Sequence, residues 1–278
     1  MSLFITSLGS GSNGNCYYIG NTSEAILVDA GISCRETVLR MSRLGLSMDR
    51  VKAIFVSHEH ADHISGIRVL SKKYRLPVYI TPDTLRLAGR ILEKEHIRHF
   101  NVEDPICIGE LSIKAFKKCH DAVDPHSFVI SSRGINIGVF TDIGNACKQV
   151  ITHFSQCDAA FLESNYCENM LRDGNYPFIL KKRISGGDGH LSNSQALELF
   201  TKYRGTQLKY LVLSHLSQNN NKPSIVEELF SKVAGNTNII IATRYRETEV
   251  IEVLPGERNT TTSTPVPVYN PAQQLSLF

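Results

Sequence analysis

The sequence predicts an α/β protein in which two β-sheets pack together and helices cover their outer faces. Each half of the chain begins with a cluster of short apolar segments and continues with helical ones, an order that favours two stacked sheets. With 278 residues, the chain is long enough for one large domain with a sizeable core. Apolar residues make up 42% and charged residues 21% of the chain, which excludes wholesale disorder and a collagen-like structure.

The expected elements of the first half alternate with turn-rich segments. Residues 9–15, GSGSNGN, form a loop after the first strand. Ser33 has Glu36 three positions later, which is the spacing of a capping box, and Gly45 is a suitable helix end. A further helix begins at Pro82, because proline is favoured in the first helical turn. We expect strands at 4–8, 16–19, 25–29, 53–56 and 78–80, and a helix that ends near Tyr74.

The second half repeats this arrangement. The segments SIKAFKK, SFVIS and INIGVF, between residues 111 and 140, are typical of strands joined by turns. Ser192 and Gln195 have the capping-box spacing at the start of a helix that ends at Tyr203. We expect further helices at 146–154 and 224–233, and further strands at 159–164, 209–214, 238–243 and 249–253.

The end of the chain differs in composition from the rest. No side chain between residues 259 and 278 is charged, and the stretch is rich in threonine and proline. Such a composition predicts an extended, flexible tail. We therefore expect one domain of residues 1–254, followed by a tail of residues 255–278.

Cysteine usage and the absence of long apolar runs bear on the cellular location. The seven cysteines are odd in number and form no CxxC pair, which indicates reduced thiols in a cytoplasmic protein. No apolar run approaches the roughly 20 residues of a membrane span, and the first residues lack the basic segment of a secretory signal. The net charge of +3 is too small to indicate a nucleic-acid partner by itself. We expect a cytoplasmic protein without a membrane partner.

Four of the six residues at positions 58–63 can bind metal ions. They are His58, His60, Asp62 and His63, and they follow an apolar strand directly. On a helix His58 and His60 would diverge by about 200°, so their spacing favours a strand end or loop. Asp62 and His63 then point elsewhere, toward a second adjacent site. A solvated polar turn is the alternative interpretation.

The segment HEHADH resembles the signature of the metallo-β-lactamase fold superfamily, which implies an αββα four-layer sandwich and two divalent metal ions. The family pattern requires a histidine, an aspartate and a histidine at three later strand ends, where this sequence has His120, Asp142 and His215. Asp29 matches a family aspartate that orients a ligand. Because every implied ligand is a histidine or an aspartate, zinc, manganese and iron suit the sites about equally. The implied ligands are His58, His60 and His120 for one ion, Asp62, His63 and His215 for the other, and Asp142 between them.

Further motifs resemble the WalJ/YycJ-like branch of this superfamily, whose members are bacterial DNA exonucleases. The matching segments are SGSNGN at 10–15, HDAxxP at 120–125, ESN at 163–165, GHLSN at 189–193 and the LSHLS segment around His215. The sequence departs from the branch at Tyr166 and Cys167, where the branch usually has His-Asp; neither is an implied metal ligand. The stretch between Asp142 and His215 is too short for the large inserted domain of the RNA-processing β-CASP branch.

This resemblance implies a metal-dependent phosphodiesterase, namely a DNA exonuclease directed to 5′ ends in DNA repair or replication. Asp62 and His190 are the implied catalytic residues, and His190 would contact the scissile phosphate or protonate the leaving oxygen. Glycines let backbone N–H groups approach a phosphate, and basic side chains bind the DNA backbone. The residues expected to contact DNA are Ser12, Asn13, Asn165, Lys182, Arg183 and Ser192. Each of these assignments has an alternative. The glycine-rich loop could be a plain hairpin loop, the basic residues could form a solvated helix end, and His190 could be a structural turn histidine.

The last five residues resemble the peptide with which bacterial proteins bind the DNA sliding clamp. They are Gln274, Leu275, Ser276, Leu277 and Phe278. Leu277 and Phe278 would fill an apolar pocket of the clamp, and Gln274 would add a polar contact. Alternatively, these apolar side chains fold back on the core. The expected partners are therefore DNA and a sliding clamp.

Two other functions remain open, because one fold can support many hydrolyses. The first is a dinuclear-metal hydrolase of a small ester, lactone or thioester. The second is a non-catalytic, clamp-bound adaptor in which the metal ions only stabilise the fold.

Overall fold

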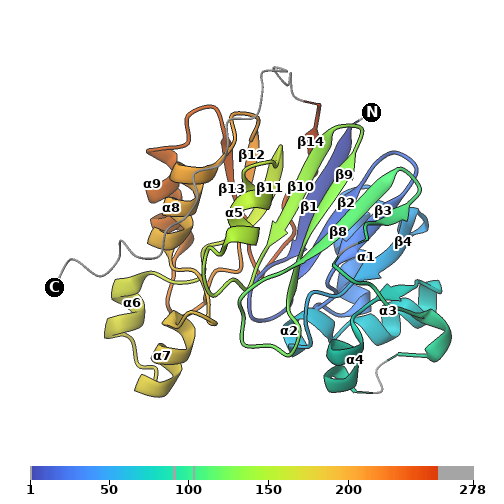
Figure 1. The fold of residues 1–278 in the computed structure, drawn as a ribbon, viewed down its shortest axis with the longest axis horizontal. Coiled ribbons are helices and arrows are strands. Elements are labelled where there is room, and N and C mark those ends of the chain that lie inside the picture. The colour runs from blue at the N-terminus through green and yellow to red at the C-terminus, as the bar shows by residue number, and fades with distance from the viewer. Residues whose placement is uncertain (1, 90–91, 103, 256–278) are drawn as a thin grey trace.

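Two seven-stranded sheets lie face to face in the computed structural model, which describes residues 2–89, 92–102 and 104–255 (Figure 1). The strands of each sheet follow one another in chain order, except that β14 returns to pair with β1. The first sheet contains, in spatial order, β14 (Ile251–Val253), β1 (Leu3–Gly9), β2 (Cys16–Gly20), β3 (Ala25–Val28), β4 (Val51–Phe55), β5 (Val78–Tyr79) and β6 (Ile97–Arg98). The second contains β13 (Asn238–Ile241), β12 (Tyr210–Ser214), β11 (Ala159–Glu163), β10 (Ile135–Phe140), β9 (His126–Ser132), β8 (Leu111–Lys117) and β7 (Ile106–Ile108).

Helices cover the outer faces of both sheets. In Figure 1, α1 and α3 flank the first sheet, and α5, α8 and α9 flank the second. The helices of the first half are α1 (Cys34–Arg43), α2 (Ala61–Ile64), α3 (Ile67–Tyr74) and α4 (Pro82–Ala88), with 3₁₀ turns η1 (Met48–Arg50) and η2 (Lys94–His96). Those of the second half are α5 (Lys148–Phe154), α6 (Glu168–Asp173), α7 (Phe178–Ser185), α8 (Asn193–Tyr203) and α9 (Pro223–Ser231).

Apolar side chains form three buried clusters, as four stacked layers require. One cluster lies between the sheets, where the ring centroids of Tyr17 and Phe161 are 4.8 Å apart. A second includes Phe154, Phe200 and Phe230, from the helices that cover the second sheet. The third lies under α1 and α3. Each fully buried aromatic side chain stabilises the fold by about 1.5–3 kcal/mol. The prediction of an αββα sandwich is confirmed.

The capping signals read from the sequence act as predicted. The Ser33 hydroxyl accepts a hydrogen bond from the backbone N–H of Glu36 at 3.2 Å, at the start of α1. Ser192 and Gln195 form a reciprocal capping box at the start of α8. Each cap satisfies backbone donors that the helix itself leaves unpaired.

The structure differs from the sequence prediction in two helical regions. The helix expected to end near Tyr74 is divided into α2 and α3 at Gly66, which packs tightly against the loop that follows β3. A Cβ atom at Gly66 would lie 2.0 Å from the carbonyl oxygen of Ile32. Helices α6 and α7 are not predicted. The sequence of α7 has no marked apolar stripe, and no residue of this helix is buried.

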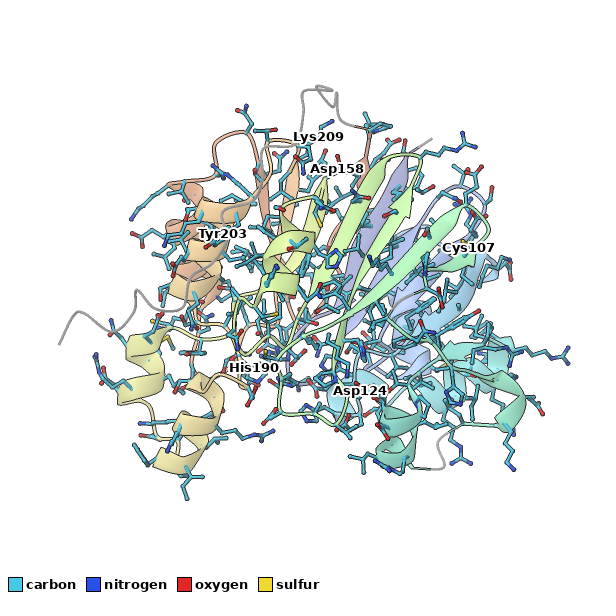
Figure 2. The ribbon with its side chains drawn as sticks, in the orientation of Figure 1. Cys107, Asp124, Asp158, His190, Tyr203 and Lys209 are labelled. Carbon is cyan, nitrogen blue, oxygen red and sulfur yellow. The ribbon has the colours of Figure 1, made fainter. Side chains whose placement is uncertain are left out.

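The loops at one end of the sandwich carry the ligands expected from the sequence. Strands β10, β11 and β12 are parallel, and β8 has the direction of β10 because both are antiparallel to β9. Strands β3 and β4 of the first sheet are also parallel. The carboxyl ends of these strands therefore meet at one edge of each sheet. Figure 2 shows His190 at this end of the molecule, and Asp158 and Lys209 at the opposite end.

Among the helices of the described residues, none combines the length and the apolarity that spanning a bilayer requires. All seven cysteines lie within the described ranges and are free thiols. Of the predicted tail, residues 256–278 lie outside the described residues, and so does the predicted clamp-binding peptide at 274–278.

Candidate metal centre

Three imidazole rings converge beyond the ends of β4 and β8. The Nδ1 atom of His60 lies 3.1 Å from Nε2 of His58 and 3.3 Å from Nε2 of His120. The Nδ1 atom of His120 faces the carbonyl oxygen of Gly189 at 3.0 Å and must donate to it, so the lone pair of a neutral ring is on Nε2. The structure therefore brings three of the expected ligands into one group that can hold a metal ion.

A second group combines one carboxylate with two imidazoles. Asp62 and His63 lie on α2, and His215 directly follows β12. The Oδ2 atom of Asp62 lies 3.5 Å from Nε2 of His63 and 3.5 Å from Nε2 of His215. These three side chains also form a group that can hold a metal ion.

Asp142 lies between the two groups. Its Oδ2 atom is 3.1 Å from Nε2 of His63, and its Oδ1 atom is 3.8 Å from Nε2 of His120. Its backbone has a φ of +54°, and His215 has a φ of +57°. Left-handed backbone is uncommon for residues other than glycine, and it carries some strain even for aspartate and histidine, which adopt it more readily than most. Two of the candidate ligands therefore sit on strained turns that directly follow strands.

Two buried polar atoms of this centre have no hydrogen bond of acceptable geometry with any described residue. They are Oδ2 of Asp142 and Nε2 of His215. An unsatisfied buried polar atom costs about 1–3 kcal/mol, so such atoms need a ligand. Five imidazoles and two carboxylates are a donor set that suits first-row divalent ions. The residues present therefore fit two metal ions.

One buried carboxylate orients two of the candidate ligands. The Oδ2 atom of Asp29 accepts a hydrogen bond from Nδ1 of His63 at 2.7 Å. It also accepts from the Ser57 hydroxyl at 2.8 Å, and that hydroxyl in turn accepts from Nδ1 of His58 at 2.8 Å. Both rings thus present Nε2 to the centre, an arrangement that fixes the ring orientation and the tautomer of metal-binding histidines.

The two groups differ in their electrostatics. Burial lowers the pKa of His58 well below its usual value and that of His120 to about 4, so both rings are neutral, which is the form that binds metals. Burial also disfavours the charged forms of His63 and His215, but nearby carboxylates, with Asp142 first among them, outweigh it. The pKa of His63 is raised well above its usual value, and that of His215 is raised to about 10. The second group therefore favours a positive charge, which a metal cation supplies.

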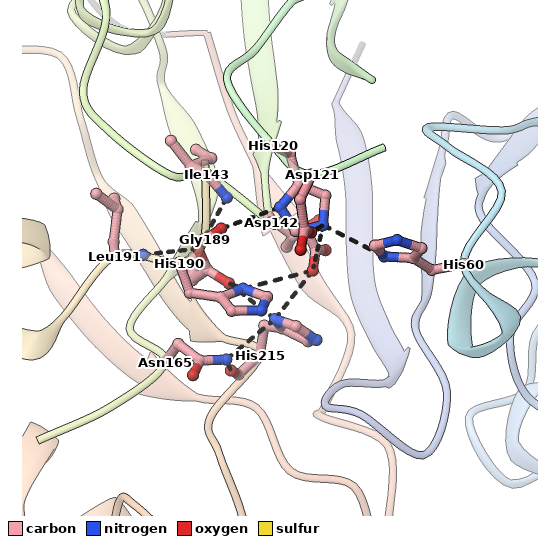
Figure 3. Close-up of polar contacts among 12 residues, drawn as sticks. His60, His120, Asp121, Asp142, Ile143, Asn165, Gly189, His190, Leu191 and His215 are labelled. Carbon is pink, nitrogen blue, oxygen red and sulfur yellow. Dashed lines mark hydrogen bonds and ion pairs between the residues drawn. The ribbon is translucent and has the colours of Figure 1, made fainter. Parts of the chain in front are cut away.

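Glu163, at the end of β11, is a site residue that the sequence analysis missed. Its Oε1 atom accepts hydrogen bonds from Nδ1 of His190 at 2.9 Å and from Nδ1 of His215 at 2.8 Å. Its Oε2 atom accepts from the backbone N–H groups of Ile143 and Leu191 at 2.8 Å and 3.0 Å. Figure 3 shows the rings of His190 and His215 side by side at this point.

These contacts stabilise the negative charge of the Glu163 carboxylate. Burial would raise the pKa of its carboxyl, but His190 and the hydrogen bonds from both rings lower it to about 2. Together with Asp142, the three side chains form a further group that could hold a metal ion. In the sequence, Glu163 is the first residue of the ESN segment and the single acidic residue at the end of the otherwise apolar strand AAFLE, but the sequence analysis assigned it no role.

Asn15 is a second residue that the sequence analysis missed. Its Nδ2 atom donates to Oδ2 of Asp62 at 3.1 Å, and its Oδ1 atom accepts from the backbone N–H of Gly11 at 2.9 Å. The glycine-rich loop therefore meets the metal centre through its last residue. Ser12 lines the cavity above the centre, whereas the Asn13 side chain accepts a hydrogen bond from Arg244 at 2.5 Å.

The other residues expected to contact DNA fall into two sets. Asn165, Arg183 and His190 line the same cavity of about 400 Å³ as Ser12. Asn165 donates to the carbonyl oxygen of His215 at 2.9 Å, and Arg183 forms an ion pair with Asp121. Outside this cavity, Lys182 lines a separate hollow between α6 and α7, and Ser192 caps α8.

Comparison with known proteins gives consistent matches. Residues 24–216 match the family model described as the Beta-lactamase superfamily domain. The chain is 33% identical over 237 residues to exodeoxyribonuclease YycJ of Bacillus anthracis, and the alignment covers 84% of this chain and 89% of that protein. It is 31% identical over 221 residues to exodeoxyribonuclease WalJ of Streptococcus pneumoniae, covering 77% of this chain and 81% of that protein. The metallo-beta-lactamase fold protein YhfI from Bacillus subtilis has a TM-score of 0.70 at 17% identity, covering 91% of this chain and 100% of that chain, which shows a shared fold.

Proposed function

Because this chain belongs to the metallo-β-lactamase fold superfamily, and within it to the branch of the YycJ and WalJ proteins, we propose that it is a metal-dependent exodeoxyribonuclease. The observation that carries the proposal is its similarity, over 84% of its length, to a relative named for that activity. The convergence of the expected ligands supports it. We include in the proposal that the enzyme starts from 5′ ends and acts in DNA repair or replication in the cytoplasm.

In this proposal the two groups hold two divalent ions, which would be zinc, manganese or iron. His58, His60 and His120 are the ligands of one ion, Asp62, His63 and His215 are the ligands of the other, and Asp142 lies between them. When bound, such ions act as Lewis acids on a phosphoryl oxygen and lower the pKa of water. Asn15 and Asp29 keep the ligands in place through the hydrogen bonds described above.

His190 is the residue that we assign to proton transfer at the leaving oxygen. Glu163 accepts the hydrogen bond of Nδ1, so Nε2 is the ring atom that remains for a substrate. The His190 side chain is 21% exposed and lines the cavity, whereas that of Glu163 is fully buried. A ring held by a buried carboxylate keeps its orientation, and an oriented imidazole can donate a proton to a leaving group.

We further propose that Ser12, Asn165 and Arg183 contact the phosphate nearest to the cleaved bond, because all three line the cavity. Asn13 and Lys182 lie beyond it, where a longer strand would reach them. The contribution of Ser192 is then indirect, through the capping of α8.

The test is degradation of linear DNA with a 5′-phosphate or a 5′-hydroxyl, in the presence of Mn²⁺ or Zn²⁺. We expect metal-dependent release of nucleotides from the 5′ end, and no release by the Asp142→Asn variant. If protein that holds two metal ions digests no DNA but cleaves esters, lactones or thioesters, the alternative hydrolase is correct. If it cleaves none of these, the adaptor function is favoured instead.

The sequence also supports a partner for the end of the chain. We propose that residues 274–278, QLSLF, bind a DNA sliding clamp, and that the uncharged stretch before them serves as a tether. Deletion of these residues is expected to abolish clamp binding, measured by surface plasmon resonance, and to leave hydrolysis of free DNA unchanged. A chain ending in the same five residues in scrambled order is the matched control. Equal clamp affinities of the full-length and truncated chains would refute the proposal.

A further inference from the structure

Helix α7 carries the two most exposed large apolar side chains of the described residues. Phe178 is 78% exposed and Ile179 is 82% exposed, and no residue of α7 is buried. Burying each of these side chains would stabilise the protein by about 1.5–3 kcal/mol. Figure 1 shows α7 at the end of the molecule where the metal centre lies. Adjacent exposed apolar side chains are more typical of binding faces than of other protein surface.

The residues of α7 line two different hollows. Arg183 and Ile184 line the metal cavity. Phe178, Lys181 and Lys182 line a second hollow, between α6 and α7. Residues three and four positions apart lie on the same helix face, so the ring and the two ammonium groups share one face. The helix is therefore the wall between the metal cavity and this second hollow.

The charges of this face are only partly compensated. Lys181 donates a hydrogen bond to the carbonyl oxygen of Arg172 at 2.6 Å, and neither Lys181 nor Lys182 forms an ion pair with any residue that the structure describes. The guanidinium of Arg172 is paired with Asp173. Glu168 is the one carboxylate among the described residues that line the hollow, and it accepts a hydrogen bond from the backbone N–H of Ser194. An exposed ring beside two unpaired cations suits a polynucleotide, which offers flat bases and phosphates together.

We propose that α7 binds the single-stranded nucleotides of a DNA substrate that lie next to the cleaved bond. One base stacks on the ring of Phe178, and backbone phosphates lie at Lys181 and Lys182. The eight residues of α7 extend over about 12 Å, the length of three to four stacked nucleotides. This inference rests on the proposed nuclease function and adds a place for the strand outside the metal cavity.

The test measures the affinity of the metal-loaded protein for a single-stranded DNA oligonucleotide with phosphorothioate linkages, by fluorescence anisotropy. Phe178→Ala is expected to weaken binding about 5- to 150-fold, the effect of removing one base–aromatic stack. Phe178→Leu keeps an apolar side chain without a flat ring and is expected to weaken binding similarly. Lys181→Ala is expected to lower the slope of log affinity against log salt by about 0.7. Val69→Ala, on the exposed face of α3, is the control and is expected to bind normally.

Hydrolysis of bis(p-nitrophenyl) phosphate separates this inference from the proposed function. Phe178 does not line the metal cavity, so Phe178→Ala is expected to hydrolyse this small ester at the wild-type rate. If the wild-type protein hydrolyses neither this ester nor DNA, the proposed function fails. If hydrolysis is normal but Phe178→Ala binds the oligonucleotide as tightly as wild type, only the α7 proposal is wrong.

Two other outcomes would also overturn the proposal. If Phe178→Leu binds the oligonucleotide with wild-type affinity, the side chain at position 178 makes an apolar contact with DNA but does not stack on a base. Normal DNA affinity of Phe178→Ala, together with a changed sedimentation coefficient, would show that α7 is a protein–protein contact.

Discussion

Replacing Asp142 with asparagine is expected to slow DNA hydrolysis by about 10³-fold or more. Its two carboxylate oxygens face His63 and His120, one from each metal group, so the variant removes the shared negative charge. The charge stabilisation that a two-metal site provides is worth several kcal/mol, and each 1.36 kcal/mol changes the rate tenfold. Asparagine has the same size and tolerates the left-handed backbone of this position, so we expect the fold to persist.

The measurement is the rate of nucleotide release at saturating metal, together with the metal content and the melting temperature of the variant. We expect fewer than two ions per chain and a preserved circular dichroism spectrum. Asp49→Asn, an exposed change of the same chemistry, is the control and is expected to behave as wild type. A fully active Asp142→Asn variant would show that no shared carboxylate is needed.

Replacing His190 with alanine is expected to lower kcat by about 10²- to 10⁴-fold, the usual contribution of a general acid. We expect KM and the metal content to change little, because both groups of expected ligands are complete without this side chain. Bis(p-nitrophenyl) phosphate releases a stable anion that needs no proton, so its hydrolysis should be much less affected.

The metal content distinguishes this role from its alternative. His190 lies close to Asp142, Glu163 and His215, a group that could itself hold a metal ion. Loss of one ion from His190→Ala would identify the histidine as a ligand. An equal loss of activity on DNA and on the p-nitrophenyl ester would also refute the role as a general acid.

The candidate ligands could be predicted from the sequence because each follows an apolar strand or lies in one short motif. Parallel strands of each sheet end on the same side of the molecule, so residues as far apart in the chain as Asp62 and His215 come together. The capping signals at Ser33 and Ser192 were equally local and were read correctly. Local sequence patterns were therefore sufficient to predict the layered fold and the candidate metal ligands.

The residues that support the ligands could not be found in this way. Glu163 acts through contacts with residues 27 and 52 positions further along the chain, and no local pattern encodes such distances. Asn15 reaches Asp62 across 47 positions. Helix α7 could not be predicted for a different reason. It buries no side chain, so its sequence lacks the apolar periodicity that indicates a helix.

The division of the centre between the two sheets sets the order of events during synthesis. His58, His60, Asp62 and His63 leave the ribosome early, but the first group is incomplete until His120 follows, and the second until residue 215 of 278. Neither group can form on a nascent chain that has been synthesised only as far as β6. Because Asp142 and His215 belong to the later half, an unfinished chain lacks the complete pair of sites. A chain synthesised only to its middle therefore lacks at least one candidate ligand of the second group.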